Sequence, residues 1–161
     1  MTAMPVSDPF KLRAATNADQ PAIWALISAV LGSYGITTSL DTTDRDLADI
    51  EASYASKGGS FFVLLDGPTV VGTVALHRES ESSCELCRMY LSPGYRRRGL
   101  GRMLLDKAVT EAKAQGYAEM RLKTAAVLVE AIRLYESVGF VKTTNIPLSE
   151  NCDLAMSKKL P

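Results

Sequence analysis

The sequence predicts a single mixed α/β (α+β) domain over residues 1–161, with a central sheet of six to seven strands flanked by about four helices. Three observations predict it. The chain has 161 residues, of which 47% are hydrophobic, enough for one core and too few for two ordinary domains. Apolar residues recur at helical spacing in some segments and at strand spacing in others. No internal repeat or low-complexity tract divides the chain.

The first half of the chain is expected to be mostly antiparallel. A strand over 10–16 precedes a helix over 18–31, which carries apolar residues one turn apart. A second helix is expected over 44–56. The period then changes to two in the segments 60–65 and 69–78, which flank the turn Asp-Gly-Pro. Alternating segments joined by such a turn predict a β-hairpin.

The second half alternates strands with helices. Gly116 and Gly139 each follow a helical pattern at a position typical of a helix end. The expected elements are, in order, a strand over 84–91, a helix over 99–115, a strand over 120–124, a helix over 128–138, and strands over 140–143 and 153–160.

The strand over 84–91 changes the face on which its apolar residues fall. Leu86 is apolar at an even position, whereas Met89 and Leu91 are apolar at odd positions. A half-buried strand keeps one parity, so one extra residue near Cys87–Arg88, a β-bulge, would explain the switch. A strand buried on both faces would also show no parity.

Charge and cysteine content limit the possible functions. Eighteen basic residues balance eighteen acidic ones, which argues against a dedicated nucleic-acid binder. Cys84 and Cys87 form a single C-x-x-C in a strand, and His77 is the one histidine, so we expect buried thiols in a reduced cell compartment and no metal site. No apolar run suggests a signal peptide or a membrane span, and the expected location is the cytoplasm.

The segment RRRGLG at 96–101 lies between a strand and a helix. Helix N-termini present unpaired backbone N–H groups, and glycines let a phosphate approach them. The segment lacks the Gly-Lys-Ser/Thr of a P-loop and the third glycine of a dinucleotide fingerprint. It fits the pattern [QR]-x-x-G-x-[GA]. The alternatives are a helix start with solvated arginines and a local nucleic-acid patch.

The surroundings of RRRGLG resemble motif A of the GNAT acetyltransferase superfamily. The similarity runs through ELCRMYLSPGYRRRGLGRMLL, and AIRLYESVGF at 131–140 resembles motif B of the same superfamily. DLAMSKKL resembles its last strand, and KLRAATNADQPAIWALI its opening strand and helix. The resemblance covers nearly the whole chain and implies the GNAT fold, with acetyl-CoA as the acetyl donor.

The resemblance also implies which residues hold the donor. The N–H groups of Arg98, Gly99, Gly101 and Arg102 would wrap the pyrophosphate, and arginine side chains would reach the outer phosphates. The backbone of the strand before them would line the pantetheine arm and polarise the thioester. The expected donor-binding residues are Met89, Tyr90, Leu91, Arg96, Arg97, Arg98, Gly99, Leu100, Gly101 and Arg102.

Two side chains are the catalytic candidates. By resemblance, Glu85 would be a general base and Tyr135 a general acid for the departing thiolate. Glu85 has two other interpretations, an anchor for the substrate ammonium and an ion pair with Arg88 or another cation. Tyr135 has one, a core residue. Many similar proteins have an asparagine seven residues before this tyrosine, where this chain has Leu128.

The acceptor residues are the least determined part of the site. Tyr34 in a loop, His77 at a strand end and Arg88, a candidate for a substrate carboxylate, are the substrate-binding candidates. The favoured function is acetyl-CoA-dependent N-acetylation of a small molecule, amino acid or peptide. The alternative is a non-catalytic acyl-CoA-binding sensor or regulatory module. A homodimer is possible, and Cys152 has no assigned role.

Overall fold

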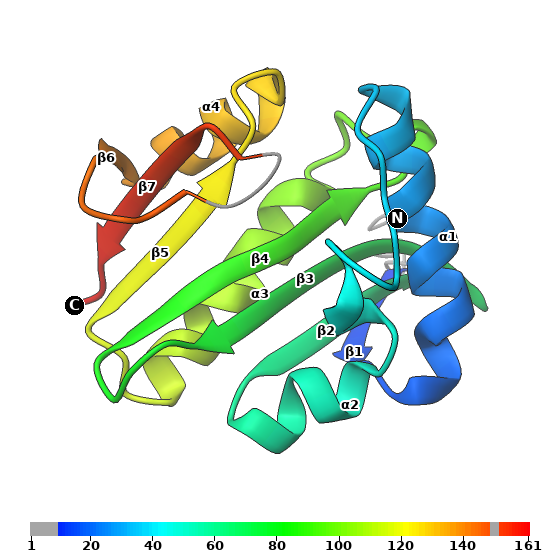
Figure 1. The fold of residues 1–161 in the computed structure, drawn as a ribbon, viewed down its shortest axis with the longest axis horizontal. Coiled ribbons are helices and arrows are strands. Elements are labelled where there is room, and N and C mark those ends of the chain that lie inside the picture. The colour runs from blue at the N-terminus through cyan, green and yellow to red at the C-terminus, as the bar shows by residue number, and fades with distance from the viewer. Residues whose placement is uncertain (1–9, 149–151) are drawn as a thin grey trace, which may run out of the picture.

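The computed structural model describes residues 10–148 and 152–161, and seven strands in them form one sheet (Figure 1). The sheet order is β1-β2-β3-β4-β5-β7-β6, and the neighbours are antiparallel apart from β4 and β5. This mixed sheet is the predicted architecture. The strands are β1 Phe10–Ala14, β2 Ser60–Asp66, β3 Thr69–Arg78, β4 Ser83–Leu91, β5 Glu119–Thr124, β6 Val141–Thr143 and β7 Leu154–Lys159.

Helices cover both faces of the sheet. The helices are α1 Gln20–Ser33, α2 Ile50–Ser53, α3 Leu100–Ala114 and α4 Val129–Ser137. Alternate residues of β2 point to opposite sides, as strand geometry requires. Phe62 and Leu64 belong to the core under α3 and α4, and Phe61 and Val63 to the core under α1 and α2. The result is a three-layer domain (Figure 1).

The prediction of one continuous helix over 44–56 is wrong. The segment forms a 3-10 turn at Arg45–Leu47, the one-turn helix α2 and a second 3-10 turn at Ala55–Lys57. Aspartate side chains favour helix caps over helix interiors, and Asp49 accepts a hydrogen bond from the N–H of Ala52 at 3.0 Å. The apolar residues of the segment are buried as their spacing predicts, but the aspartates divide the helix.

Helix α3 begins beside the strand ends that carry the site. Gly99, at φ 78°, is its N-cap, and a left-handed backbone there suits glycine. Leu104, Ala108 and Ala112, four residues apart, are fully buried on one face. The packing of this stripe against β3 and β4 fixes where the N-terminus of α3 points.

The parallel strands β4 and β5 separate along their length. Their pairing starts at Ser83↔Glu119 and ends at Glu85↔Arg121, although both strands continue. Beyond this point β5 pairs with β7 on its other side, and β4 pairs with β3. The sheet therefore opens between β4 and β5, and this opening positions the candidate site.

Candidate active site

A β-bulge lies in β4 at the place the sequence predicted. Ala75 pairs with Cys87 and Thr73 pairs with Tyr90, so Arg88 and Met89 together lie opposite the single residue between them in β3. Arg88 has φ 52°, a left-handed conformation for a non-glycine residue. The Thr73 hydroxyl donates to the Arg88 carbonyl at 2.7 Å, which holds the bulge in place.

The bulge switches the faces of β4 as expected. Leu86 before it and Met89 and Leu91 after it all pack with the core under α3, whereas Cys87 and Tyr90 pack with the other core. The alternative of a strand without parity is thus excluded. Residues 88 and 89 leave the regular ladder beside the opening of the sheet.

Two cavities meet at the bulge. One, of about 350 Å³, lies between β4 and β5, and we call it the acceptor cavity. The other, of about 280 Å³, lies at the start of α3, and we call it the donor cavity. Both are lined by the same four residues, Met89, Tyr90, Leu128 and Ala131. The two therefore form one continuous cleft across the bulge.

The donor cavity collects most of the residues predicted to bind phosphates. Its lining includes Arg96, Arg97, Gly99, Gly101 and Arg102, beside Met89, Tyr90 and Leu91 from β4. The arginine side chains are available there because their ion pairs are weak or exposed. Arg97 meets Glu130 at 3.7 Å with 88% and 61% of these side chains exposed, and such a pair contributes little.

Two predicted donor-binding residues point elsewhere. The guanidinium of Arg98 lies over the rings of Phe10 and Tyr95, at 5.1 and 5.4 Å from their centres. The side chain of Leu100 is buried in the core. Neither residue lines the cleft, so any contact with a donor falls to their backbone N–H groups.

Tyr135, on α4, lines the acceptor cavity. Its ring packs edge-on against Phe140 at 5.8 Å and is 6% exposed. Burial, together with Tyr90 and Cys87 nearby, raises the pKa of Tyr135 well above its ordinary value. No hydrogen bond in the described residues uses its hydroxyl, and no side-chain oxygen there is both buried and unpaired. The hydroxyl is therefore not sealed in the core, and the cavity that Tyr135 lines is where a ligand can reach it.

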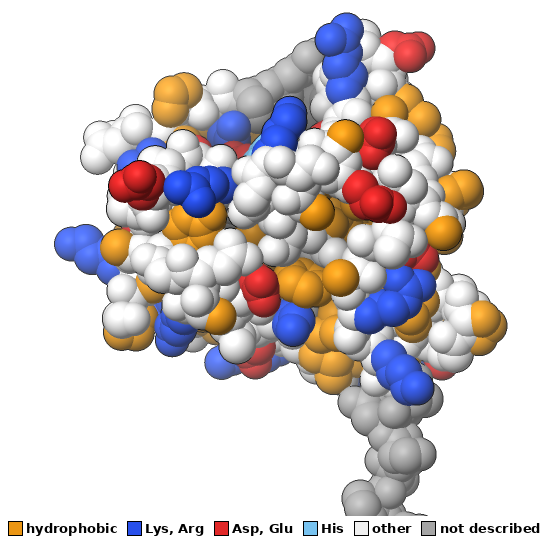
Figure 2. All heavy atoms as spheres, turned by 90° about the horizontal axis from the view of Figure 1, so that it is seen from below, with side chains coloured by type: hydrophobic (Ala, Val, Ile, Leu, Met, Phe, Trp, Pro, Cys, Tyr) orange, Lys and Arg blue, Asp and Glu red, His pale blue; other side chains and the backbone are white. Residues whose placement is uncertain are grey.

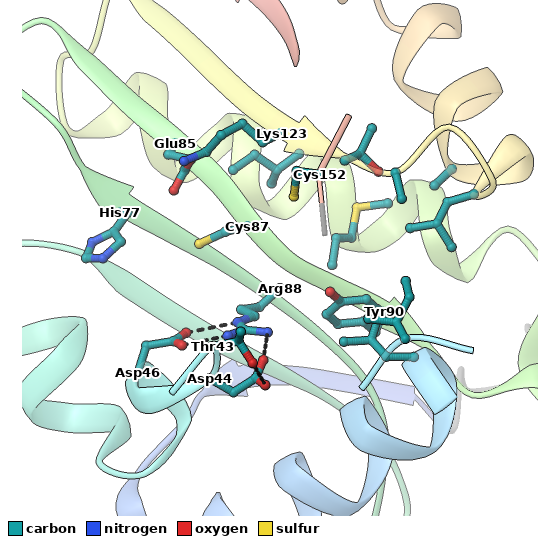
Figure 3. Close-up of a pocket in the computed structure, with 18 of the residues that line it drawn as sticks. Thr43, Asp44, Asp46, His77, Glu85, Cys87, Arg88, Tyr90, Lys123 and Cys152 are labelled. Atoms are coloured by element: carbon teal, nitrogen blue, oxygen red, sulfur yellow. Dashed lines mark hydrogen bonds and ion pairs between the residues drawn. The ribbon is translucent and has the colours of Figure 1, made fainter. Parts of the chain in front are cut away.

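Glu85 lies on the wall of the acceptor cavity, where β4 and β5 begin to separate (Figure 3). Its carboxylate meets Lys123 of β5 at 3.1 Å, with 16% and 25% of the two side chains exposed. Of the ion pairs that the sequence left open, the one with another cation is formed and the one with Arg88 is not. A carboxylate that faces both a lysine and a cavity can still accept a proton or hold an ammonium.

Arg88 is engaged by the chain itself (Figure 3). Its guanidinium donates to Asp46 through Nε at 2.9 Å and Nη2 at 2.6 Å, and to Asp44 through Nη1 at 2.9 Å. Burial opposes the charge of Arg88, but Asp46 outweighs it and raises the Arg88 pKa. Sequence reasoning missed Asp44, Asp46 and Lys123, because nothing in a linear pattern brings residues so far apart along the chain into contact.

The remaining substrate candidates divide between the cavities. His77 lines the acceptor cavity, where its ring lies 5.2 Å from that of Tyr54. Tyr34 lines the donor cavity instead. The thiols of Cys87 and Cys152 also line the acceptor cavity, and all three cysteines are free. Burial raises the pKa of Cys87, so its thiol stays protonated.

Cys84 and Cys87 do not form a pair. Cys84 packs with the core under α3, and Cys87 with the core on the opposite face.

Within residues 10–148 and 152–161, no three His, Cys, Asp or Glu residues are arranged to hold a metal ion, and no helix has the length and apolar character to cross a membrane. Acidic and basic side chains are interspersed on the face in Figure 2.

Solved structures share this fold over nearly the whole chain. A GNAT family acetyltransferase from Staphylococcus aureus Mu50 has a TM-score of 0.87 and 22% identity, over 94% of this chain and 99% of that one. The acetyltransferase YncA of Salmonella typhimurium, solved with acetyl-CoA, has a TM-score of 0.75 and 23% identity, over 96% and 95% of the two chains. The architecture is therefore that of GNAT-type acetyltransferases.

Sequence similarity defines the family. A model described as the acetyltransferase (GNAT) family matches residues 25–140. The N-acetyltransferase YjgM of Escherichia coli K12, itself uncharacterized, is 37% identical over 134 residues, which cover 80% of this chain and 80% of that protein. The chain belongs to the acetyltransferase (GNAT) family, and it is an acyltransferase.

Proposed function

We propose that the chain moves an acetyl group from acetyl-CoA to the amine of a small molecule or peptide by direct attack of the amine on the thioester. The observation that carries the proposal is the continuous cleft across the bulge. Three arginines and two glycines line one end, and Glu85 and Tyr135 line the other. Membership of an acetyltransferase family favours this enzyme over a non-catalytic sensor.

The donor cavity suits an anionic donor such as acetyl-CoA. Gly101 lines this cavity, and a Cβ there would come within 3.3 Å of the Leu134 side chain, so a larger residue would crowd the cavity wall. The backbone N–H groups at the start of α3 and the side chains of Arg96, Arg97 and Arg102 would hold the phosphates. YncA of Salmonella typhimurium, whose fold is similar, was solved with acetyl-CoA. When bound, acetyl-CoA supplies the activated thioester.

The acceptor cavity supplies the proton transfers. Glu85 would take a proton from the acceptor ammonium, directly or through water. Backbone N–H groups beside the bulge would polarise the thioester carbonyl, and Tyr135 would give its proton to the departing thiolate. The ion pair with Lys123 would hold the Glu85 carboxylate in place on the cavity wall.

Calorimetric titration with acetyl-CoA, followed by a transfer assay on a panel of amines, tests the proposal. ATP and a short DNA duplex are the controls, because each carries phosphates without a pantetheine arm. We expect selective binding of acetyl-CoA and acetylation of at least one amine. If the folded protein binds DNA or ATP as tightly as it binds acetyl-CoA, RRRGLG is not a specific site for the donor.

A further inference from the structure

The acceptor cavity carries a built cluster of one cation and two anions. Arg88 donates two hydrogen bonds to Asp46, at 2.9 and 2.6 Å, and a third to Asp44 at 2.9 Å. The side chains of Arg88 and Asp44 are only 13% and 5% exposed. The guanidinium that would otherwise bind a substrate carboxylate is therefore already bound to carboxylates of the chain.

Neutral groups donate further hydrogen bonds to the two carboxylates of this cluster. Asp44 Oδ2 accepts from the Ser39 N–H and the Thr43 hydroxyl, each at 2.8 Å. Asp46 Oδ2 accepts from the Tyr54 hydroxyl. Neutral donors orient a carboxylate without cancelling its charge. The cluster thus keeps one net negative charge in a fixed position.

The two ends of the cleft differ in charge. Among the described residues that line the acceptor cavity, Glu85 and Lys123 cancel as an ion pair, which leaves the negative charge of the Arg88 cluster. In the donor cavity, three arginines face one acidic residue, Glu130. A positive end suits the phosphates of an anionic donor, and a negative end attracts cations and repels anions.

We propose that the acceptor is a cationic amine without a carboxylate beside the amino group, and that the Asp44–Arg88–Asp46 cluster excludes free amino acids. The inference rests on the proposed acetyl transfer and narrows its acceptor. A free amino acid would bring a carboxylate next to a cluster whose only cation is already neutralised. A simple amine brings only its ammonium, which the excess negative charge favours.

Matched pairs of amines test the inference. Tyramine and tyrosine, cadaverine and lysine, and agmatine and arginine differ within each pair only by the carboxylate. Binding is measured by calorimetry with CoA present, and transfer is measured from acetyl-CoA, both at pH 8, where histidine is ordinarily neutral. We expect each amine to exceed its amino acid by about tenfold or more in affinity and in kcat/KM.

The variant Asp46→Asn tests the cluster directly. Asparagine keeps the size of the side chain but removes one negative charge, so the preference for the amine should shrink by about tenfold. Asp44→Asn should have the same effect, which guards against a fault peculiar to one site. Asp19→Asn is the matched control. Asp19 also accepts two hydrogen bonds from an arginine, Arg13, at 2.7 and 2.8 Å, but it does not line the cleft. Thermal unfolding verifies that each variant is folded.

The outcomes separate this inference from the function on which it rests. Amino acids bound and acetylated as well as the amines would overturn the inference and leave acetyl transfer standing. Selective binding of the amines without transfer would support the inference and contradict the proposed function. Equal effects of Asp46→Asn and Asp19→Asn on the preference would show that the cluster does not set it.

Discussion

The Tyr135 hydroxyl is protonated at neutral pH, as an ordinary tyrosine is, and burial raises its pKa further above 10.0. A protonated hydroxyl at the cavity has a proton to give to a departing thiolate, although a raised pKa makes it a weaker acid. We expect Tyr135→Phe to lower kcat by about tenfold or more, with little change in acetyl-CoA affinity. Steady-state kinetics and calorimetry measure the two effects.

Tyr117→Phe is the control for Tyr135→Phe. Tyr117 is also 6% exposed, but it does not line the cleft. Its substitution should leave kcat unchanged. If the two variants have the same kcat, Tyr135 is a core residue and not the acid.

The proposed role of Glu85 as general base can be tested by one substitution. Glu85→Gln keeps the shape of the side chain but cannot accept a proton, so the fall in rate at low pH should disappear and kcat should drop by about a hundredfold. The pH dependence of kcat/KM measures this. Glu119→Gln removes a carboxylate that pairs with Arg121 outside the cleft, and it should leave the profile as it is. An unchanged profile in Glu85→Gln would remove Glu85 as the base.

Asp46 links the site to stability. Burial opposes its charge, but the hydrogen bonds and charge of Arg88 outweigh this, so the pKa of Asp46 lies below the ordinary 3.8. A carboxyl with a lowered folded-state pKa stabilises the fold above its unfolded pKa, and this stabilisation is lost as the pH falls through the folded pKa.

Asp46→Asn should therefore lower the free energy of unfolding at pH 7 by about 1.5–3 kcal/mol, the contribution of a hydrogen bond to a charged group. The difference from the unsubstituted protein should shrink as the pH falls below 3.8. Urea unfolding at a series of pH values measures it. A difference that stays constant down to pH 3 would mean that the charge of Asp46 contributes nothing.

At the scale of elements, we propose that backbone N–H groups at the start of α3 bind the phosphates of the donor. Gly101→Glu puts bulk and a negative charge among the N–H groups that would hold phosphates, and it should abolish acetyl-CoA binding in calorimetry. Gly94→Glu adds the same charge in the preceding loop, where a Cβ meets no atom within 4 Å, and it should bind nearly normally. If folded Gly101→Glu binds acetyl-CoA normally, the start of α3 is not the phosphate site.

The bulge in β4 holds Arg88 in a backbone conformation that is unfavourable for the residue by itself. Arg88 adopts φ 52° although it is not glycine, a conformation that costs about 1–3 kcal/mol. The Thr73 hydroxyl and the two aspartates offset that cost. The bulge thus places Arg88 on the acceptor cavity and takes Met89 out of the regular ladder with β3.

For the whole molecule, the cleft separates two parts of one sheet. β4 and β5 pair over three residues only, and beyond them each belongs to a different side of the opening. A donor bound in the cleft would contact both sides, so it would bind only the folded state. Acetyl-CoA at a hundred times its Kd should raise the free energy of unfolding by about 2.7 kcal/mol. Denaturant titration measures this, and no rise at saturation would contradict binding in the cleft.

The sequence alone determined the features that depend on local pattern. Apolar spacing predicted the order of the strands and helices, because burial on one face imposes a period of two or 3.6. The parity of Leu86, Met89 and Leu91 predicted the bulge, and the two segments RRRGLG and LYESVGF were enough to indicate the family.

Only the tertiary structure decided which side chains meet across the cleft. The aspartates that divide the segment 44–56 approach Arg88 from more than 40 positions away, and Lys123 reaches Glu85 only because β4 and β5 are parallel neighbours. Charge pairing of this kind depends on distance in space, which residue spacing does not encode. The sequence thus predicted which residues would line the donor cavity, because most of them are close together along the chain, and the tertiary structure decided the charge of the acceptor cavity.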